Sequence, residues 1–153
     1  MKKTTLSFLP RPALWLSLAA LSALLHAPAS AETHLVRMLN RNATGAMVYE
    51  PDFLQIRPGD TVKFLATRSG HDAASIENMM PDGAKPFKGG IDEEIEVSFD
   101  VPGLYGVKCL PHYAMGMVML IQVGDGDARQ MLKIPSDVPA LARKRFEEIL
   151  SRR

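Results

Sequence analysis

Six short stretches of aliphatic, aromatic and β-branched residues recur along the chain, and their lengths constrain its fold more than any other feature. Each is four to seven residues long, which is the usual length of a strand and too short for a typical helix. Turn-forming sequences separate them, for example at Asn42 to Gly45 and at Arg57 to Asp60. The pattern predicts strands at 33–39, 53–56, 61–67, 94–99, 104–108 and 117–123. It indicates a mainly β protein, built as a β-sandwich or barrel.

The chain has a different pattern after Gly124, because the β-branched runs stop there. Near the C-terminus, apolar side chains recur at helical spacing and would lie on one face of a helix. They are Val138, Ala142, Phe146, Ile149 and Leu150. We therefore predict two C-terminal α-helices, at about 126–133 and about 137–151, that cover the open side of the sandwich.

The first 31 residues have the parts of a secretory signal. Three basic residues precede an apolar run at 13–27, which is shorter than the roughly 20 residues that span a membrane. Ala29 to Ala31 then reads Ala-Ser-Ala, a small-residue cleavage site. We expect cleavage after Ala31, export to the periplasm and a mature chain that is not embedded in a membrane. The alternative is an uncleaved anchor, which Pro28 and the short run disfavour.

Residues 32–153 are enough for one domain, and their charges nearly balance. The whole chain has a formal net charge of +1 at pH 7, and the segment 32–153 carries 15 basic and 17 acidic residues. This balance lacks the strongly basic field with which proteins bind nucleic acid, so we expect no nucleic-acid partner.

The segment KCLPHYAMGM, residues 108–117, contains the only cysteine of the chain. In an exported protein a single cysteine forms no internal disulfide. Cys109 is therefore a buried small side chain, a reactive thiol, half of an intermolecular bridge or a metal ligand. His112 and Met117 follow it at the spacing CxxHxxxxM. Thiolate, imidazole and thioether together form the soft ligand set that selects copper in a trigonal site with a weak axial sulfur.

Such a site needs a second imidazole, for which His34 and His71 are the candidates. His71 is the better one because its loop follows the predicted strand 61–67, whereas His34 lies inside the first predicted strand. A cysteine nucleophile activated by His112 is a competing interpretation. However, no acidic residue of that loop is placed to orient the imidazole, and Met117 would have no role. Zinc prefers a harder ligand or a thiolate to a thioether.

Four longer segments point to a known family: GAMVYEPDFLQIRPGDTVKF, MMPDGAKPFK, PGLYGVKCLPHYAMGMV and QVGD. They resemble the pseudoazurins, which are blue copper electron carriers of the cupredoxin family. The resemblance implies that residues 32–153 form a cupredoxin-like Greek-key β-sandwich with two C-terminal α-helices. It also implies one type 1 copper per chain, cycling between Cu(I) and Cu(II). The implied ligands are His71, Cys109, His112 and Met117, with Met115 a close neighbour outside the ligand set.

The resemblance further implies a function without catalysis, because these carriers pass single electrons and transform no substrate. The implied partners are periplasmic redox proteins, such as a copper nitrite reductase or a cytochrome, which meet a monomer in weak and transient contacts around His112. We expect the contact to be an apolar patch of Met47, Pro81, Pro111, Ala114 and Met115, ringed by Arg41, Arg68, Lys85, Lys88 and Lys108. The alternative is a periplasmic copper carrier or store that uses the same site.

Two residues depart from the family pattern. Cupredoxins commonly have Asn after the first ligand histidine and Ser or Thr after the cysteine, and these side chains tie the two ligand loops together. Here the positions hold Asp72 and Leu110. We expect that the usual tie does not form, although the Asp72 backbone N–H still donates to the Cys109 sulfur. A carboxylate at this position would lower the reduction potential of copper.

Overall fold

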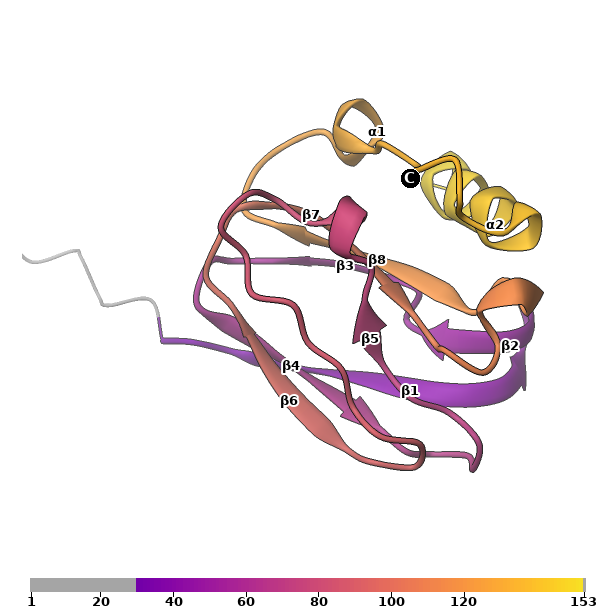
Figure 1. Cartoon of the computed structure of the whole chain (residues 1–153). Coiled ribbons are helices and arrows are strands. Elements are labelled where there is room, and N and C mark those ends of the chain that lie inside the picture. The colour runs from indigo at the N-terminus through magenta and orange to yellow at the C-terminus, as the bar shows by residue number, and fades with distance from the viewer. Residues whose placement is uncertain (1–29, 153) are drawn as a thin grey trace, which may run out of the picture. The chain divides into compact units, whose positions relative to one another are not determined.

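Two four-stranded β-sheets pack face to face around a hydrophobic core (Figure 1). The computed structural model describes residues 30–152, so the expected signal segment, residues 1–31, lies almost entirely outside the described residues. The sheets have the strand orders β2-β1-β4-β6 and β3-β8-β7-β5. The strands are β1 (Thr33–Asn42), β2 (Gly45–Glu50), β3 (Phe53–Ile56), β4 (Asp60–Leu65), β5 (Ala74–Ser75), β6 (Ile95–Phe99), β7 (Gly103–Lys108) and β8 (Val118–Val123). The predicted β-sandwich is confirmed.

Strands β2 and β5 are the two that the sequence pattern does not predict. β2 returns along β1 after the turn at Asn42 to Gly45, and this antiparallel pair extends to Arg37 opposite Glu50. β5 consists of only two residues, which pair with the end of β7. A two-residue strand contains no alternation to detect, so only its partner strand defines it.

The core between the sheets is formed by every second residue of strands such as β4, in which buried and partly exposed side chains alternate. In β4, Val62 and Phe64 are fully buried, whereas Thr61, Lys63 and Leu65 are partly exposed. The Phe64 ring lies 6.1 Å from the Tyr49 ring in an edge-on arrangement, and 5.9 Å from the Phe87 ring. Because alternate residues of a strand face opposite sides, this pattern fixes the register of β4 in its sheet.

Strand β8 is buried on both faces, which explains its nearly continuous apolar sequence. Met119 and Ile121 pack in the core between the sheets, whereas Val118 and Leu120 pack on the other side. That outer face is covered by the helix α2 (Ala140–Ser151), which contributes buried side chains to the same cluster (Figure 1).

The two C-terminal helices are confirmed, but both are shorter than predicted. α1 spans Ala128–Met131, and α2 begins at Ala140 instead of residue 137. The late start has a local cause, because proline disfavours helical backbone in the residue before it, and Pro139 follows Val138. No helix among residues 30–152 is long and apolar enough to cross a membrane.

The strand pairing brings segments that are distant in sequence to one end of the sandwich. β1 and β4 run parallel, so the end of β1 and the loop after β4 lie at the same end. On the facing sheet, Ala74 pairs with Lys108, which places the residues just before β5 beside those just after β7. His71 and Cys109 lie in these two segments.

Candidate metal centre

The loop between β4 and β5 holds His71 in a fully buried position. Gly70, which precedes it, has a φ of 93°, in the left-handed region that glycine adopts without strain. Asp92, which precedes β6, holds this loop in place through two hydrogen bonds. One carboxylate oxygen of Asp92 accepts the Gly70 N–H at 2.6 Å, and the Asp92 N–H donates to the His71 carbonyl at 2.8 Å.

The second loop leaves β7 at Cys109 and folds back onto itself before β8. The His112 N–H donates to the Cys109 carbonyl at 3.2 Å, and the Met117 N–H donates to the His112 carbonyl at 3.2 Å. The Cys109 N–H in turn donates to the Met117 carbonyl at 3.1 Å. Gly116 allows this return, since its φ is 87° and a Cβ there would lie 3.0 Å from the carbonyl oxygen of Leu141 in α2.

Three candidate ligand atoms meet where the two loops touch. Nδ1 of His71 and Nδ1 of His112 are 3.1 Å apart, and the Cys109 Sγ lies 3.8 Å from the first and 3.5 Å from the second. Atoms with these separations share a point about 2 Å from each of them, which is the length of a bond between a metal and an imidazole or thiolate. Among the described residues these three form the one group of His, Cys, Asp and Glu side chains positioned to hold a metal ion.

This donor set fits copper. Two imidazole nitrogens and a thiolate are the equatorial ligands of a trigonal copper site, and a thioether is the usual weak axial ligand. Met117 is fully buried in the same core cluster as Cys109, and its backbone is bonded to both Cys109 and His112. The role of Met117 as a ligand remains a prediction.

Burial sets the protonation of the two innermost groups. It raises the pKa of the Cys109 thiol from 9.0 to about 11, although backbone hydrogen bonds from Asp72 and His112 act in the opposite direction. Burial also lowers the pKa of His71, and the neighbouring His112 lowers it further. The lowered pKa favours the neutral imidazole of His71, the form that binds metals, whereas Cys109 must release its proton when a metal binds.

Asn40 is a residue of this site that the sequence analysis missed. Its side-chain oxygen lies 2.7 Å from Nε2 of His71. When Nε2 carries the proton and donates to Asn40, Nδ1 has its lone pair free to face Cys109 and His112. Asn40 stands 31 residues before His71, and no local spacing links them. Only the parallel pairing of β1 with β4 brings the two residues together.

Asp72 ties the two ligand loops in a way that the sequence analysis did not expect. Its Oδ1 accepts the Leu110 backbone N–H at 2.6 Å, so the carboxylate needs no hydroxyl side chain at position 110. The usual tie between two side chains is absent, as expected, and the Asp72 carboxylate ties the loops through the Leu110 backbone instead. The Asp72 backbone N–H acts to lower the pKa of the Cys109 thiol, which is the effect expected of a donor near the sulfur. The buried Tyr49 hydroxyl donates to the Asp72 backbone carbonyl at 2.7 Å, so Asp72 is also anchored to the hydrophobic core.

The surface next to the three donors is apolar at its centre. His112 is half-buried, and Pro111, Ala114 and Met115 beside it are exposed. Leu110 adds a further apolar side chain, which is 40% exposed. The structure thus places three of the five expected patch residues around His112, with Met47 half-buried.

Pro81 does not belong to this patch, and the expectation that it does is wrong. A Cβ on Gly103 would lie 2.7 Å from the Cβ of Pro81, so Pro81 packs at the start of β7. Cys109 follows the end of the same strand, which at about 3.3 Å per residue is roughly 20 Å away. The proline-rich sequence around position 81 contains no signal that distinguishes one end of the sandwich from the other.

Two of the five expected basic residues have a defined place near the centre. Ala74 pairs with Lys108 on one side and with Lys88 on the other, so the two lysines flank the same residue. Both line a cleft of about 530 Å³ that also includes Leu110 and Tyr113. The Lys108 ammonium lies 5.2 Å from the centre of the Tyr113 ring. Arg41, Arg68 and Lys85 are exposed.

Comparison with known proteins identifies the family. Residues 36–124 match the family of copper binding proteins described as plastocyanin/azurin. The chain is 46% identical over 137 residues to a putative pseudoazurin of Rhizobium leguminosarum bv. viciae, covering 88% of this chain and 90% of that one. It is 43% identical over 138 residues to the pseudoazurin of Paracoccus pantotrophus, covering 88% and 95%.

Solved structures give the same result. The pseudoazurin of Methylobacterium extorquens AM1 superposes with a TM-score of 0.71 at 39% identity, covering 78% of this chain and 98% of that one. The pseudoazurin of Hyphomicrobium denitrificans has a TM-score of 0.71 at 38% identity, covering 79% and 98%. The resemblance inferred from the sequence motifs is thereby confirmed, and with it the cupredoxin fold. The chain belongs to the plastocyanin/azurin family of copper-binding proteins.

Proposed function

We propose that this protein is a type 1 copper electron carrier whose ligands are His71, Cys109, His112 and Met117. The main support for this proposal is that Nδ1 of His71, Nδ1 of His112 and Sγ of Cys109 lie 3.1, 3.5 and 3.8 Å from one another. The buried Met117 belongs to the same loop as Cys109 and His112. When bound there, copper supplies a one-electron couple between Cu(II) and Cu(I). The protein residues hold the donor atoms in place, so little has to move when the charge changes.

The burial of the site supports electron transfer over chemistry on a bound substrate. The side chains of His71, Cys109 and Met117 are fully buried, and among the proposed ligands only His112 is partly exposed. Substrate binding to a metal needs an open coordination position on an accessible side. An electron needs only a short path, and the imidazole edge of His112 provides one to the surface.

The surface around His112 supports a brief contact with a redox protein. Exposed Leu110, Pro111 and Met115 give it an apolar centre, and Lys88 and Lys108 lie beside that centre. A small apolar contact with charges at its rim gives fast association and fast release. The natural partners are acidic periplasmic redox proteins, such as a copper nitrite reductase or a cytochrome, and the protein meets them as a monomer.

Export places this function in the periplasm. In this proposal residues 1–31 are the secretory signal, and the mature domain is residues 32–153. The sequence Ala-Ser-Ala that ends at Ala31 supports this boundary. The start of β1 at Thr33 supports it as well, because the folded domain then begins directly after the cleavage site.

The ligand set is tested by visible and electron paramagnetic resonance spectra of the copper-loaded protein. We expect intense thiolate-to-copper absorption, which Cys109→Ser abolishes because the thiolate is removed. His71→Gln should also abolish it, whereas His34→Gln, which replaces the other candidate histidine, should leave it unchanged. Retention of the absorption in Cys109→Ser, or its loss only in His34→Gln, would contradict the assignment.

A further inference from the structure

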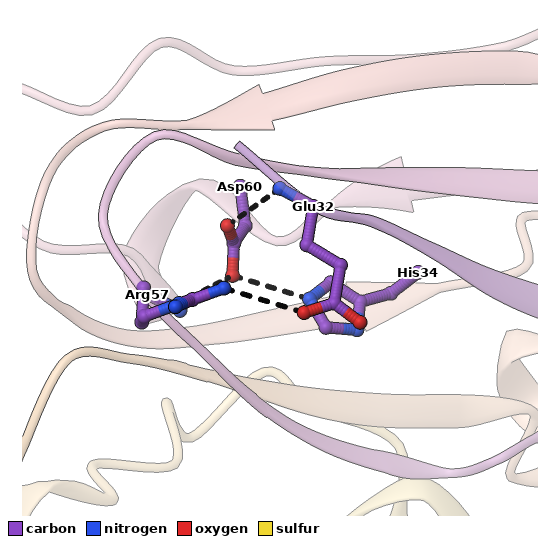
Figure 2. A network of polar contacts seen from close by, with 4 residues as sticks. All are labelled: Glu32, His34, Arg57 and Asp60. Carbon is purple, nitrogen blue, oxygen red and sulfur yellow. Dashed lines mark hydrogen bonds and ion pairs between the residues drawn. The ribbon is translucent and has the colours of Figure 1, made fainter. Parts of the chain in front are cut away.

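A cluster of charged groups lies around the start of β1 and β4, and we call it the Asp60 cluster: Glu32, His34, Arg57 and Asp60 (Figure 2). The Asp60 carboxylate is at its centre, and the residue is only 2% exposed. Its Oδ1 accepts the backbone N–H of Glu32 at 2.9 Å, and its Oδ2 accepts the backbone N–H of Arg57 at 2.9 Å. Nε2 of His34 lies 3.2 Å from the same Oδ2.

The cluster lies at the opposite end of the first sheet from the metal centre. β1 and β4 run parallel and both begin here, whereas His71 follows the end of β4 and Asn40 lies near the end of β1. The Asp60 cluster therefore has no part in the copper chemistry, and the proposed function does not use it.

Glu32 is anchored to the folded domain through both of its backbone groups. Its N–H donates to Asp60, and its carbonyl accepts the Thr61 N–H at 2.8 Å, which begins the ladder between β1 and β4. Ser30 and Ala31, directly before it, are exposed and precede β1. The expected cleavage site thus lies at the boundary between exposed chain and anchored strand.

We propose that removal of residues 1–31 creates an ion pair between the new α-ammonium group of Glu32 and the buried Asp60 carboxylate, so that processing itself stabilises the domain. In this step a signal peptidase catalyses attack of water on the Ala31–Glu32 peptide bond. Ala31 keeps the new carboxylate. The Glu32 nitrogen leaves as an amine and takes up a proton, 2.9 Å from Asp60 Oδ1.

The surroundings of Asp60 favour such a pair. Asp60 is only 2% exposed, whereas Glu32 beside it is exposed, so an added positive charge acts on the carboxylate through the short 2.9 Å contact and is partly screened by water. Nε of Arg57 is 3.7 Å from Oδ2, and the other end of that guanidinium is shared with the Glu32 side chain at 3.3 Å. Asp125 is the remaining charged residue that lines the adjoining cleft of about 320 Å³. A charge-assisted hydrogen bond from an ammonium is roughly twice as strong as one from an amide N–H.

The first test determines which residue is the N-terminus of the exported protein. The full chain is expressed with its own leader, and the periplasmic product is purified with copper bound. Its intact mass should correspond to a chain that begins at Glu32. A product that begins at any other residue would overturn the proposal, because its α-ammonium group would not lie against Asp60.

The second test compares this product with a chain that begins at Ala31, in the same copper-bound form. The longer chain keeps the Glu32 N–H but moves the positive charge one residue away. The Glu32 form should unfold at a temperature about 3–6 °C higher at pH 6, which is the expected size for one charge-assisted hydrogen bond. In an Asp60→Asn background this difference should disappear, whereas Asp125→Asn should leave it intact. Equal unfolding temperatures, or a difference that survives Asp60→Asn, would overturn the proposal.

The pH dependence provides a readout that does not depend on the Asp60→Asn variant folding. An ammonium that gains a carboxylate partner has a raised pKa in the folded state. Its stabilisation is therefore complete below the ordinary α-amino pKa of about 8 and is lost as pH rises through the raised value. The other titratable groups facing the ammonium, His34 and the carboxylates of Glu32, Asp60 and Asp125, are the same in both chains. The difference should thus shrink only on the alkaline side. A difference that persists unchanged to pH 11 would show that the charge plays no part.

Discussion

The side-chain oxygen of Asn40, near the end of β1, lies 2.7 Å from Nε2 of the buried His71. A buried imidazole N–H without an acceptor is unfavourable, so this contact fixes which ring nitrogen carries the proton. The other nitrogen, Nδ1, then faces Cys109 and His112 with a free lone pair. Asn40 is a positioning residue for the metal centre, because it acts through His71 and supplies no ligand atom.

Replacing Asn40 with Ala should weaken copper binding by about 10- to 100-fold, the range found when a hydrogen-bond partner of a metal ligand is removed. Competition with a chelator of known affinity measures the change. The matched control is Asn42→Ala on the same strand, since the Asn42 amide donates to Glu50 at 2.9 Å and not to a ligand. Equal affinities for Asn40→Ala and the unchanged protein would remove Asn40 from the site.

Replacing Asp72 with Asn should raise the reduction potential. The Asp72 carboxylate accepts the Leu110 N–H next to Cys109, and a negative charge there favours the more positive, oxidised metal. Its removal should raise the potential by roughly 50–100 mV, which corresponds to about 1–2 kcal/mol for a one-electron couple. Voltammetry measures the shift, with the exposed Asp125→Asn at the other end of the sheet as control. An unchanged potential in Asp72→Asn would exclude an electrostatic role.

Reversing the charge of Lys108 should slow electron exchange with an acidic redox partner. Lys108 lines the cleft beside Leu110 together with Lys88, so its positive charge lies next to the apolar surface around His112. Lys108→Glu should lower the association rate constant about tenfold at low salt, and the difference should shrink as ionic strength rises. Stopped-flow kinetics with a copper nitrite reductase measures both effects. Lys133→Glu is the control, because Lys133 lines a cleft beside Pro81 and the start of β7.

Copper should leave this protein slowly. The proposed ligands His71, Cys109 and Met117 are fully buried, so a competing chelator reaches the ion only past His112 or after local opening. Absorbance of a mild Cu(I) chelator mixed with the reduced protein should therefore rise over hours. Complete transfer within seconds would favour the alternative function, a periplasmic copper carrier or store.

Asp60 should stabilise the fold at neutral pH, and this stabilisation should be lost in acid. Hydrogen bonds from the backbone N–H groups of Glu32 and Arg57 hold the pKa of this carboxyl well below its usual range. A lowered pKa in the folded state stabilises the protein above the ordinary aspartate pKa of about 3.9, and this contribution is lost as pH falls below it. Unfolding temperatures measured from pH 7 to pH 2 should therefore differ between the unchanged protein and Asp60→Asn at neutral pH and converge in acid. A constant difference over the whole range would contradict this assignment.

The local features of the metal centre could be read from the sequence. Cys109, His112 and Met117 lie within one short loop, so their spacing alone brings them together whatever the rest of the chain does. The chemistry of these side chains then limits the choice of metal, because a thiolate beside an imidazole and a thioether suits copper. The strands with clear alternation were also predictable, since alternation depends only on neighbouring residues.

Contacts between distant segments required the folded structure. The pairing of β1 with β4 places Asn40 against His71, the meeting of two loops lets Asp72 accept the Leu110 N–H, and the direction of β7 separates Pro81 from Cys109. Each depends on which strands are neighbours and in what register. Register is set by how whole sheets bury their apolar faces, and no short stretch of sequence contains that information. The sequence alone thus determined the proposed copper-binding loop and the β-sandwich, whereas tertiary packing decided which side chains orient the proposed ligands.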